Sequence, residues 1–265
     1  MRALLLAAGL GTRMQPLTSL LPKCLAPIHG RPLLDYWLET LLNHGVAEIL
    51  VNTHYMEPMV RKFISQSTWC HRIKLVHEEC LLGTGGTILK NRDFFGEQAF
   101  LVAHADNLTI FDAADFANSH ANRPARAELT MMVFETPDPK SCGIVELDKL
   151  GVVQAFHEKV PCPPGKLANA AVYILEPTVV DRMAALGKDQ IDLSTEVLPN
   201  MLGKMYSYHN TAYHRDIGTL NSWMEANQDF PPMPAAEQNS RAWASITGCG
   251  GGDLVRKIER FIISK

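Results

Sequence analysis

Residues 6–23 read LAAGLGTRMQPLTSLLPK, and this stretch decides how the chain is interpreted. A glycine turn, an arginine and a lysine follow directly on a short apolar run. Gly9 and Gly11 can adopt backbone angles that other residues avoid, so the chain can fold closely around a phosphate and point its N–H groups at it. Arg13 and Lys23 add positive charge and strong hydrogen-bond donors. The stretch predicts a strand followed by a loop that binds the phosphates of a nucleoside triphosphate.

Two other phosphate-binding motifs fit the same stretch poorly. Met14 occupies the position at which a dinucleotide fingerprint has its third glycine. The acidic residue that this fingerprint needs about 20 positions further on is absent from the expected strand context. A Walker loop, which ends in Gly-Lys-Ser or Gly-Lys-Thr, occurs nowhere in the chain. A Walker-type site is therefore rejected, and a nicotinamide-dependent oxidoreductase is disfavoured.

The composition is that of a globular chain with a sizeable core. Of 265 residues, 46% are hydrophobic and the formal net charge is -3, so no strong field favours nucleic acid or an acidic membrane. The six cysteines form no C-x-x-C pair, which argues against zinc and indicates the reduced thiols of a cytoplasmic protein. No apolar run approaches the roughly 20 residues that cross a bilayer. Leu4–Leu10 fits a buried first strand better than a leader.

Strands and helices alternate through the first half of the chain. Short connections between them predict a parallel sheet covered by helices on both faces. The expected strands are Arg2–Ala7, Ala47–Val51, Arg72–His77 and Ala99–Ala103, and the expected helices are Leu33–Leu42 and Met59–Ile64.

The pattern changes after about residue 127, where successive strand-like runs are separated by Gly, Pro and Asp and indicate hairpins. A proline-rich and glycine-rich tail follows, with one apolar helical face near its end. The expected strands are Glu128–Glu135, Gly143–Glu146, Val152–Phe156, Ala170–Leu175, Tyr206–Tyr208 and Tyr213–Asp216. Pro177–Leu186 is expected to be a helix, Phe230–Pro234 and Gly248–Gly252 to be linkers, and Leu254, Val255, Ile258, Phe261 and Ile262 to line a final helix.

Two aspartates stand where a metal-assisted phosphate reaction needs them. Asp106 follows the apolar run at 100–103 and so lies near the carboxyl end of a strand, where ligands bind in open α/β sheets. Asp216 lies at another junction between a strand and a turn. Mg²⁺ prefers oxygen donors of this kind. Each aspartate taken alone is more typical of a helix cap or a turn, so at this point the two are only candidate ligands for a magnesium ion.

The stretch from Gly9 to Lys23, with Pro16 and Thr18 inside it, closely resembles the signature of sugar-1-phosphate nucleotidyltransferases. The run Leu82–Gly86 resembles the guanylyltransferases that act on mannose or heptose phosphates. The resemblance covers residues 1 to about 228. It implies a Rossmann-like, mostly parallel mixed α/β sheet with flanking helices and a β-rich sugar-binding part. The nucleotide-binding part is expected at about 1–126 and the sugar-binding part at about 127–228, with a linker and helical tail at 229–265.

The resemblance also implies a role for individual residues, although Ala105, Val160 and Ala171 depart from the family pattern. Asp106 and Asp216 are expected to hold Mg²⁺, and Arg13, Lys23 and Asp106 to be catalytic. The nucleotide is expected to contact Leu6, Ala8, Gly9, Gly11, Thr12, Glu78, Gly83, Thr84 and Gly85. The sugar phosphate is expected to contact Gly143, Glu158, Lys159 and Asn169.

These assignments describe an enzyme that joins an NTP to a sugar 1-phosphate and releases pyrophosphate. GTP with a mannose-type or heptose-type phosphate is the favoured pair. A uridylyltransferase for an amino-sugar phosphate, such as N-acetylmuramic acid 1-phosphate, is one alternative, and a silent NDP-sugar-binding subunit is another. No nucleic-acid or membrane partner is expected. Because the resembled family is often dimeric, a homodimer stays open, with the tail as a candidate interface.

Overall fold

The structure is a computed structural model of the whole chain, and it describes residues 1–248, 253, 255, 256, 258 and 260. The chain forms two compact units and passes between them several times. Unit 1 comprises Met1–Leu4, Cys80–His104 and Ile110–His214, and unit 2 comprises Leu5–Glu79, Ala105–Thr109 and Arg215–Lys265. Strand β1 (Ala3–Leu6) is therefore shared by the two units.

Unit 2 contains the parallel strands that follow the first glycine turn. β4 pairs with β5 in parallel register, from Ile49 opposite Ile73 to Thr53 opposite His77. The predicted helix over 33–42 is α1, and its apolar side chains, Trp37 among them, are buried. The elements of this unit are β2 (Pro27–Ile28), β3 (Arg31–Pro32), α1 (Leu33–Asn43), β4 (Ile49–Thr53), α2 (Glu57–Gln66), β5 (Ile73–His77), α7 (Leu220–Asp229) and α8 (Glu237–Thr247).

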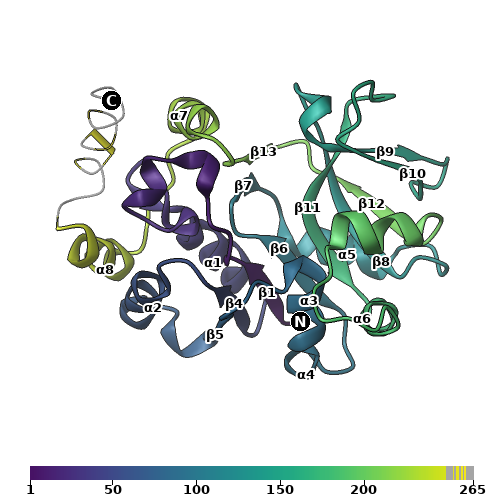
Figure 1. Cartoon of the computed structure of the whole chain (residues 1–265), viewed down its shortest axis with the longest axis horizontal. Coiled ribbons are helices and arrows are strands. Elements are labelled where there is room, and N and C mark those ends of the chain that lie inside the picture. The colour runs from purple at the N-terminus through teal and green to yellow at the C-terminus, as the bar shows by residue number, and fades with distance from the viewer. Residues whose placement is uncertain (249–252, 254, 257, 259, 261–265) are drawn as a thin grey trace. The chain divides into compact units, whose positions relative to one another are not determined.

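Unit 1 is dominated by antiparallel strands (Figure 1). Its strands follow the order β10-β9-β11-β6, and β8 pairs with β11 on one side and, in parallel, with β12 on the other. These strands are β6 (Phe100–His104), β8 (Leu129–Glu135), β9 (Gly143–Leu147), β10 (Val153–Glu158), β11 (Leu167–Leu175) and β12 (Met205–His209). The helices are α3 (Gly83–Lys90), α4 (Arg92–Phe95), α5 (Ala113–Ala121) and α6 (Pro177–Ala184).

Two further strands, β7 (Asn107–Ile110) and β13 (Tyr213–Asp216), each contain a point at which the chain changes unit. The expected mixed α/β class is confirmed, with its strand-rich second half. Every strand and helix predicted over the described residues is present, with ends shifted by a few residues. The sequence analysis did not predict the helices α3, α4, α5, α7 and α8 or the strands β2, β3 and β7. The predicted final helix lies largely outside the described residues, although Val255 and Ile258 are helical.

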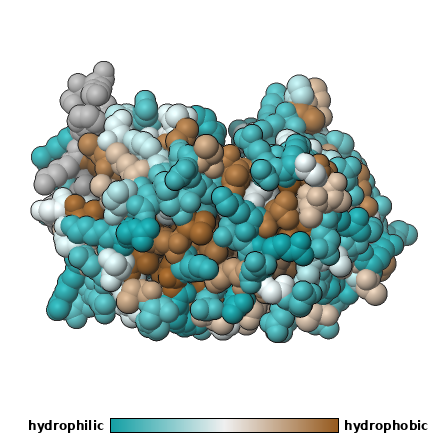
Figure 2. All heavy atoms as spheres, turned by 60° about the horizontal axis from the view of Figure 1, so that its bottom comes forward, coloured by the Kyte–Doolittle hydropathy of each residue, from teal (hydrophilic) through white to brown (hydrophobic). Residues whose placement is uncertain are grey.

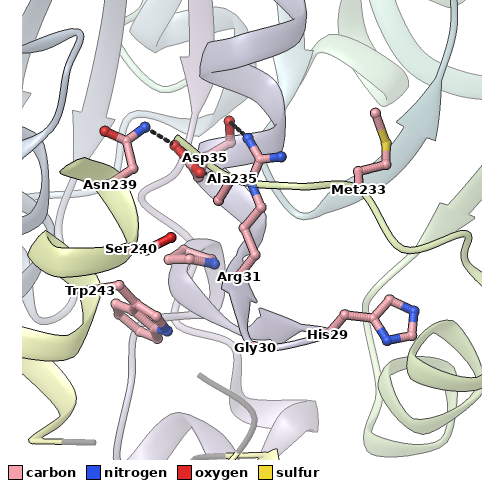
Figure 3. Close-up of a pocket in the computed structure, with 10 residues that line it drawn as sticks. His29, Gly30, Arg31, Asp35, Met233, Ala235, Asn239, Ser240 and Trp243 are labelled. Carbon is pink, nitrogen blue, oxygen red and sulfur yellow. Dashed lines mark hydrogen bonds and ion pairs between the residues drawn. The ribbon is translucent and has the colours of Figure 1, made fainter. Parts of the chain in front are cut away.

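Helix α8 packs beside α2 (Figure 1), and a buried polar network fixes it there. Asn239 donates from Nδ2 to Asp35 Oδ1 at 2.6 Å and accepts from the Thr68 N–H at 2.8 Å. Arg31 donates from Nε to the other oxygen of Asp35 at 2.7 Å and from Nη1 to the Pro234 carbonyl at 3.1 Å. Figure 3 shows Asn239 and Arg31 both pointing at Asp35. Pro234 and helix α8 are therefore part of the packed unit.

A cavity of about 250 Å³ lies next to this network and is lined by residues of β3, α1 and α8 (Figure 3). Burial raises the pKa of the Asp35 carboxyl, and the Arg31 guanidinium opposes this shift only in part. The indole N–H of Trp243, also at the cavity, is buried and has no partner among the described residues.

The surface carries scattered apolar side chains among hydrophilic ones, as the face in Figure 2 shows. Leu10 and Leu20, both in the segment of the first glycine turn, are among the exposed large apolar residues. Single exposed leucines are usual on protein surfaces. Over the described residues, no helix combines the length and the apolar character that a membrane span requires.

Candidate active site

The predicted site residues fall into two groups, one in each unit. Unit 2 holds Leu6, Ala8, Gly9, Gly11, Thr12, Arg13, Lys23, Glu78, Asp106 and Asp216. Unit 1 holds Gly83, Thr84, Gly85, Gly143, Glu158, Lys159 and Asn169.

The first glycine turn is built around Gly11. Its φ is +65°, and a Cβ at this position would lie 2.7 Å from Thr18 Cγ2 and 3.2 Å from Lys23 Cβ, so only glycine fits. The Thr18 hydroxyl donates to the Gly11 carbonyl at 2.8 Å and closes the turn. Gly9 has no heavy atom within 4 Å of such a Cβ, and its outer side is open. The turn therefore leaves room for a ligand next to Gly9 while its other end is packed.

Arg13 follows this turn in a short 3-10 helix and is exposed. Its guanidinium makes no hydrogen bond or ion pair with the residues that the structure describes. A guanidinium in solvent beside an open glycine turn can donate two parallel hydrogen bonds to a phosphate. The structure thus leaves Arg13 available for the role that the sequence predicts.

Lys23, Asp106 and Asp216 come together, although they are far apart in the sequence. The Lys23 ammonium contacts Asp106 Oδ2 and lies 3.8 Å from Asp216 Oδ1. The Lys23 side chain is only 9% exposed, whereas those of Asp106 and Asp216 are 31% and 58% exposed. A hydrogen bond from the Ile217 N–H to the Asp106 carbonyl, at 3.0 Å, ties the two acidic segments together. The cluster is buried on its lysine side and open to solvent on its carboxylate side.

The donor set of this cluster fits Mg²⁺. Two carboxylate oxygens that converge on one ammonium supply the hard oxygen ligands that Mg²⁺ takes from proteins. Over the described residues, no group of three or more His, Cys, Asp and Glu side chains forms a metal site. Mg²⁺ commonly keeps waters and binds through one or two carboxylates together with the phosphates of a substrate. Asp106 and Asp216 would hold the ion under these conditions.

Glu78 is buried and belongs to a hydrogen-bond network that reaches Ala7, shortly before the glycine turn. Asn52 donates from Nδ2 to Glu78 Oε1 at 3.0 Å and accepts at Oδ1 from the Ala7 N–H at 2.7 Å. Asn52 thereby joins the end of β1 to the end of β5. Sequence analysis did not assign a role to Asn52, although an amide side chain directly after the apolar run 49–51 was a usable signal. The predicted contact of Glu78 with the nucleotide stays a prediction.

The glycines at 83–86 are required by packing against the segment 189–191. A Cβ on Gly83 would lie 2.5 Å from the Ile191 carbonyl oxygen, and one on Gly85 would lie 2.7 Å from Ile191 Cγ2. The N–H groups of Gly85 and Gly86 donate to the Ile191 carbonyl at 2.9 and 3.2 Å. Thr84 accepts the Leu193 N–H at 2.7 Å. These groups already have partners in unit 1. Packing against the segment 189–191 is therefore a second explanation for the glycines, besides the expected approach of a nucleotide base.

Gly143 and Glu158 are directly opposite each other in the pair of β9 and β10. A Cβ on Gly143 would lie 2.7 Å from Glu158 Oε2, so the glycine allows the carboxylate to lie over the strand. Lys159 follows with its ammonium 3.4 Å from Glu158 Oε1, and its φ is +50°, an angle that side chains rarely adopt. This strained residue presents its cation to solvent at the end of β10.

Asn169 is held by its own strand. Its Oδ1 accepts the Ala171 N–H at 2.9 Å, and its Nδ2 donates to the Tyr173 hydroxyl at 2.7 Å. Ala171 has a φ of +52° in an irregular stretch of β11, where the register shifts between Asn169 and Tyr173. Burial raises the pKa of Tyr173 far above its usual value, so this hydroxyl keeps its proton. Sequence analysis missed the anchoring role of Tyr173.

Comparison with known proteins defines the class of this chain. The chain belongs to the nucleotidyl transferase family, whose model matches residues 2–231. The resemblance seen in the glycine-turn segment is thereby confirmed.

Particular relatives share much of the chain. A mannose-1-phosphate guanylyltransferase of Mycobacterium tuberculosis is 32% identical over 242 residues, which are 88% of this chain and 66% of that protein. A glucose-1-phosphate thymidylyltransferase of Streptomyces griseus is 28% identical over 234 residues, 86% of this chain and 65% of that protein. The chain thus spans less than two thirds of both. The structure of HddC from Yersinia pseudotuberculosis complexed with GMP-PN has a TM-score of 0.73 at 25% identity, covering 87% of this chain and 99% of that one.

Proposed function

We propose that this chain is a sugar-1-phosphate nucleotidyltransferase that uses an NTP and releases pyrophosphate. The observation that carries the proposal is the convergence of Asp106 and Asp216 on the ammonium of Lys23, beside the turn at Gly11. The membership of the nucleotidyl transferase family supports it.

The reaction needs no nucleophile from the protein. An oxygen of the sugar phosphate attacks the α-phosphorus of the NTP, and the bond from this phosphorus to the bridging oxygen breaks, so that its electron pair leaves with pyrophosphate. Position and charge stabilisation dominate such transfers. Arg13 and Lys23 neutralise the phosphate oxygens. Asp106 and Asp216 hold Mg²⁺, which when bound neutralises charge and orients the phosphates.

The residues of unit 1 supply the sugar side of the proposal. Glu158 accepts hydrogen bonds from sugar hydroxyls, Lys159 faces the phosphate, and Asn169 supplies a carbonyl and an amide that its own strand orients. Gly143 is assigned to the sugar phosphate as well, and its missing Cβ leaves room for the Glu158 carboxylate beside the strand. Gly83, Thr84 and Gly85 are assigned to the nucleotide, together with Leu6, Ala8, Gly9, Gly11, Thr12 and Glu78.

For the substrates, we propose GTP and a mannose-type or heptose-type sugar 1-phosphate. The name of the Mycobacterium tuberculosis relative and the GMP-PN complex of the HddC structure support guanine. The thymidylyltransferase among the relatives is the reason to test every base.

Pyrophosphate release with Mg²⁺ tests the proposal. GTP, UTP, dTTP, CTP and ATP are each combined with the 1-phosphates of mannose, heptose, glucose, N-acetylglucosamine and N-acetylmuramic acid. We expect GTP with mannose or heptose phosphate to give the highest kcat/KM. If only UTP with an amino-sugar phosphate gives turnover, the enzyme class stands and the proposed substrates are wrong. Binding of an NDP-sugar without turnover in any pair would overturn the enzyme and leave a regulatory subunit.

A further inference from the structure

The Lys23 ammonium contacts the same two carboxylates that are proposed to hold the metal. It touches Asp106 Oδ2 and lies 3.8 Å from Asp216 Oδ1. A metal ion that binds both aspartates therefore competes with this ammonium for the same oxygens, and at close range the two cations repel each other. Because the lysine side chain is only 9% exposed, solvent screens this repulsion weakly.

The carboxylates alone are also a poor metal site. Over the described part of the chain, no third acidic, histidine or cysteine side chain completes a metal-binding group. The ammonium offsets one of the two carboxylate charges, and a site with few ligands and a reduced negative charge binds Mg²⁺ weakly. The missing ligands must come from water or from a bound nucleotide.

Lys23 also lies beside the glycine turn. The Cβ of Lys23 lies 3.2 Å from the position that a Cβ on Gly11 would take, so its stem begins beside the turn that is assigned to the phosphates. A lysine side chain is a flexible four-carbon stem with a rotatable ammonium. Its charge can therefore pass from the carboxylates to a triphosphate without a movement of the backbone.

We propose that Lys23 is a counter-ion switch that makes metal binding depend on the nucleotide. Without nucleotide, its ammonium offsets one of the two negative charges of Asp106 and Asp216, occupies the space between them and lowers their affinity for divalent cations. The triphosphate of the incoming nucleotide attracts the ammonium, and the two carboxylates become free to bind the metal. The switch rests on the proposed function, because it assumes that these aspartates bind metal and that the glycine turn binds phosphate.

Binding of Mn²⁺, followed by the electron paramagnetic resonance of the free ion, tests the switch without any turnover. The full chain is titrated with Mn²⁺ in the presence and absence of a non-hydrolysable GTP analogue. Lys23→Met removes the charge, Lys23→Arg keeps it, and Asp106→Asn removes one metal ligand and so reports the Mn²⁺ that the analogue binds by itself. Lys23→Gln is a second neutral variant in case the methionine does not fold.

Without nucleotide, we expect the neutral variant to bind Mn²⁺ about 10-fold or more tightly than wild type, and Lys23→Arg to resemble wild type. The analogue should raise the Mn²⁺ affinity of wild type well above that of Asp106→Asn, and should raise that of the neutral variant less. Equal affinity of wild type and both neutral variants without nucleotide would overturn the switch. If wild type with the analogue binds no more Mn²⁺ than Asp106→Asn does, the metal site, and with it the proposed function, is contradicted instead.

Discussion

Unit 2 contains two clusters of the same composition, each with one cation and two carboxylates. Arg31 lies between Asp35 and Glu39, and Lys23 lies beside Asp106 and Asp216. In the Arg31 cluster, the aspartate is 1% exposed and the guanidinium also donates to the carbonyl oxygens of Asp35 and Pro234. In the Lys23 cluster, Asp216 is 58% exposed.

The difference separates a structural cluster from the cluster that we propose to be functional. A buried ion pair is retained at little cost only when hydrogen bonds satisfy its charges, as they do around Arg31. The Lys23 cluster keeps carboxylate oxygens facing solvent, where a substrate or a metal can reach them. Both clusters have the same composition, so the exposure of their carboxylates tells them apart.

The largest effect is expected from Asp106→Asn. It removes a proposed metal ligand and the contact of Lys23, so kcat/KM for pyrophosphate release should fall by about 10³-fold. Because Asp106 is partly exposed, the thermal midpoint should stay within a few degrees of wild type. Steady-state kinetics on the preferred substrate pair and a thermal melt measure both. A loss below 10-fold would contradict the role assigned to the Lys23 cluster.

Asp35→Asn is expected to act on stability instead. The variant keeps only one of the two side-chain oxygens that accept from Asn239 and Arg31, so a buried donor is left without its acceptor, which should cost about 2 kcal/mol of the free energy of unfolding. Urea denaturation measures this loss, and activity per folded molecule should stay near wild type. The double variant Arg31→Met with Asp35→Asn is the control, since removing both charges should recover part of the loss. A fall in kcat without a fall in stability would show that the Arg31 cluster serves activity and not the fold.

Glu128 in unit 1 has the reverse composition, one carboxylate with two cations. Arg182 and Lys204 both hydrogen-bond it, mainly Arg182, and lower its pKa from 4.5 to about 2. A lowered carboxyl pKa stabilises the fold above the unfolded value, and this gain is lost as the pH falls through the folded value. Glu128→Gln should therefore cost about 2 kcal/mol at neutral pH.

The cost of Glu128→Gln should shrink below pH 4.5 and nearly vanish towards pH 2. Asp35 should behave in the opposite way. Because burial raises its pKa above 3.8, its ionisation costs stability, and this cost disappears as the pH falls through the raised pKa. Urea denaturation of each variant against wild type at several pH values checks both signs. If the difference in free energy of unfolding between wild type and Glu128→Gln does not change with pH, the ion pairs of Glu128 do not stabilise the fold.

The smallest effect is expected from Glu39→Gln. Glu39 Oε2 lies 2.7 Å from Arg31 Nη2, but its side chain is 32% exposed. An ion pair that solvent reaches is worth less than about 1 kcal/mol. In urea denaturation, the loss in free energy of unfolding for Glu39→Gln should therefore be no more than half the loss for Asp35→Asn. Equal costs would mean that exposure does not distinguish the partners of Arg31.

The expectations that succeeded rest on local chemistry. The apolar runs predicted the strands, because a buried strand needs little beyond its own residues. The glycine turn, Lys23 and the two aspartates could be chosen because the residue types match the chemistry of phosphates and metals. The structure brings Lys23 and the two aspartates together, and their roles stay predictions. The kind of contact, an ammonium beside both carboxylates, depends on distances that no sequence pattern contains.

The expectations that fell short depend on long-range packing. The run Gly83–Gly86 is a poor helix former, and yet it begins α3, because the segment 189–191 binds its N–H groups. Asn52 and Tyr173 anchor other site residues through hydrogen bonds with partners in the fold. The start of α5 was also missed, although a local signal marked it. Asp112 is the N-cap and accepts hydrogen bonds from the N–H groups of Ala114 and Asp115.

The docking of α8 bears on where this protein is cut for study. The family model ends at residue 231, and the alignment would suggest a shorter chain that stops there. Such a truncation would remove the Asn239 amide from Asp35 and the Pro234 carbonyl from Arg31, and would uncover the side chains that α8 covers on α2. The boundary drawn by homology is therefore not a boundary of cooperative folding, and expression trials should retain the chain through at least Thr247.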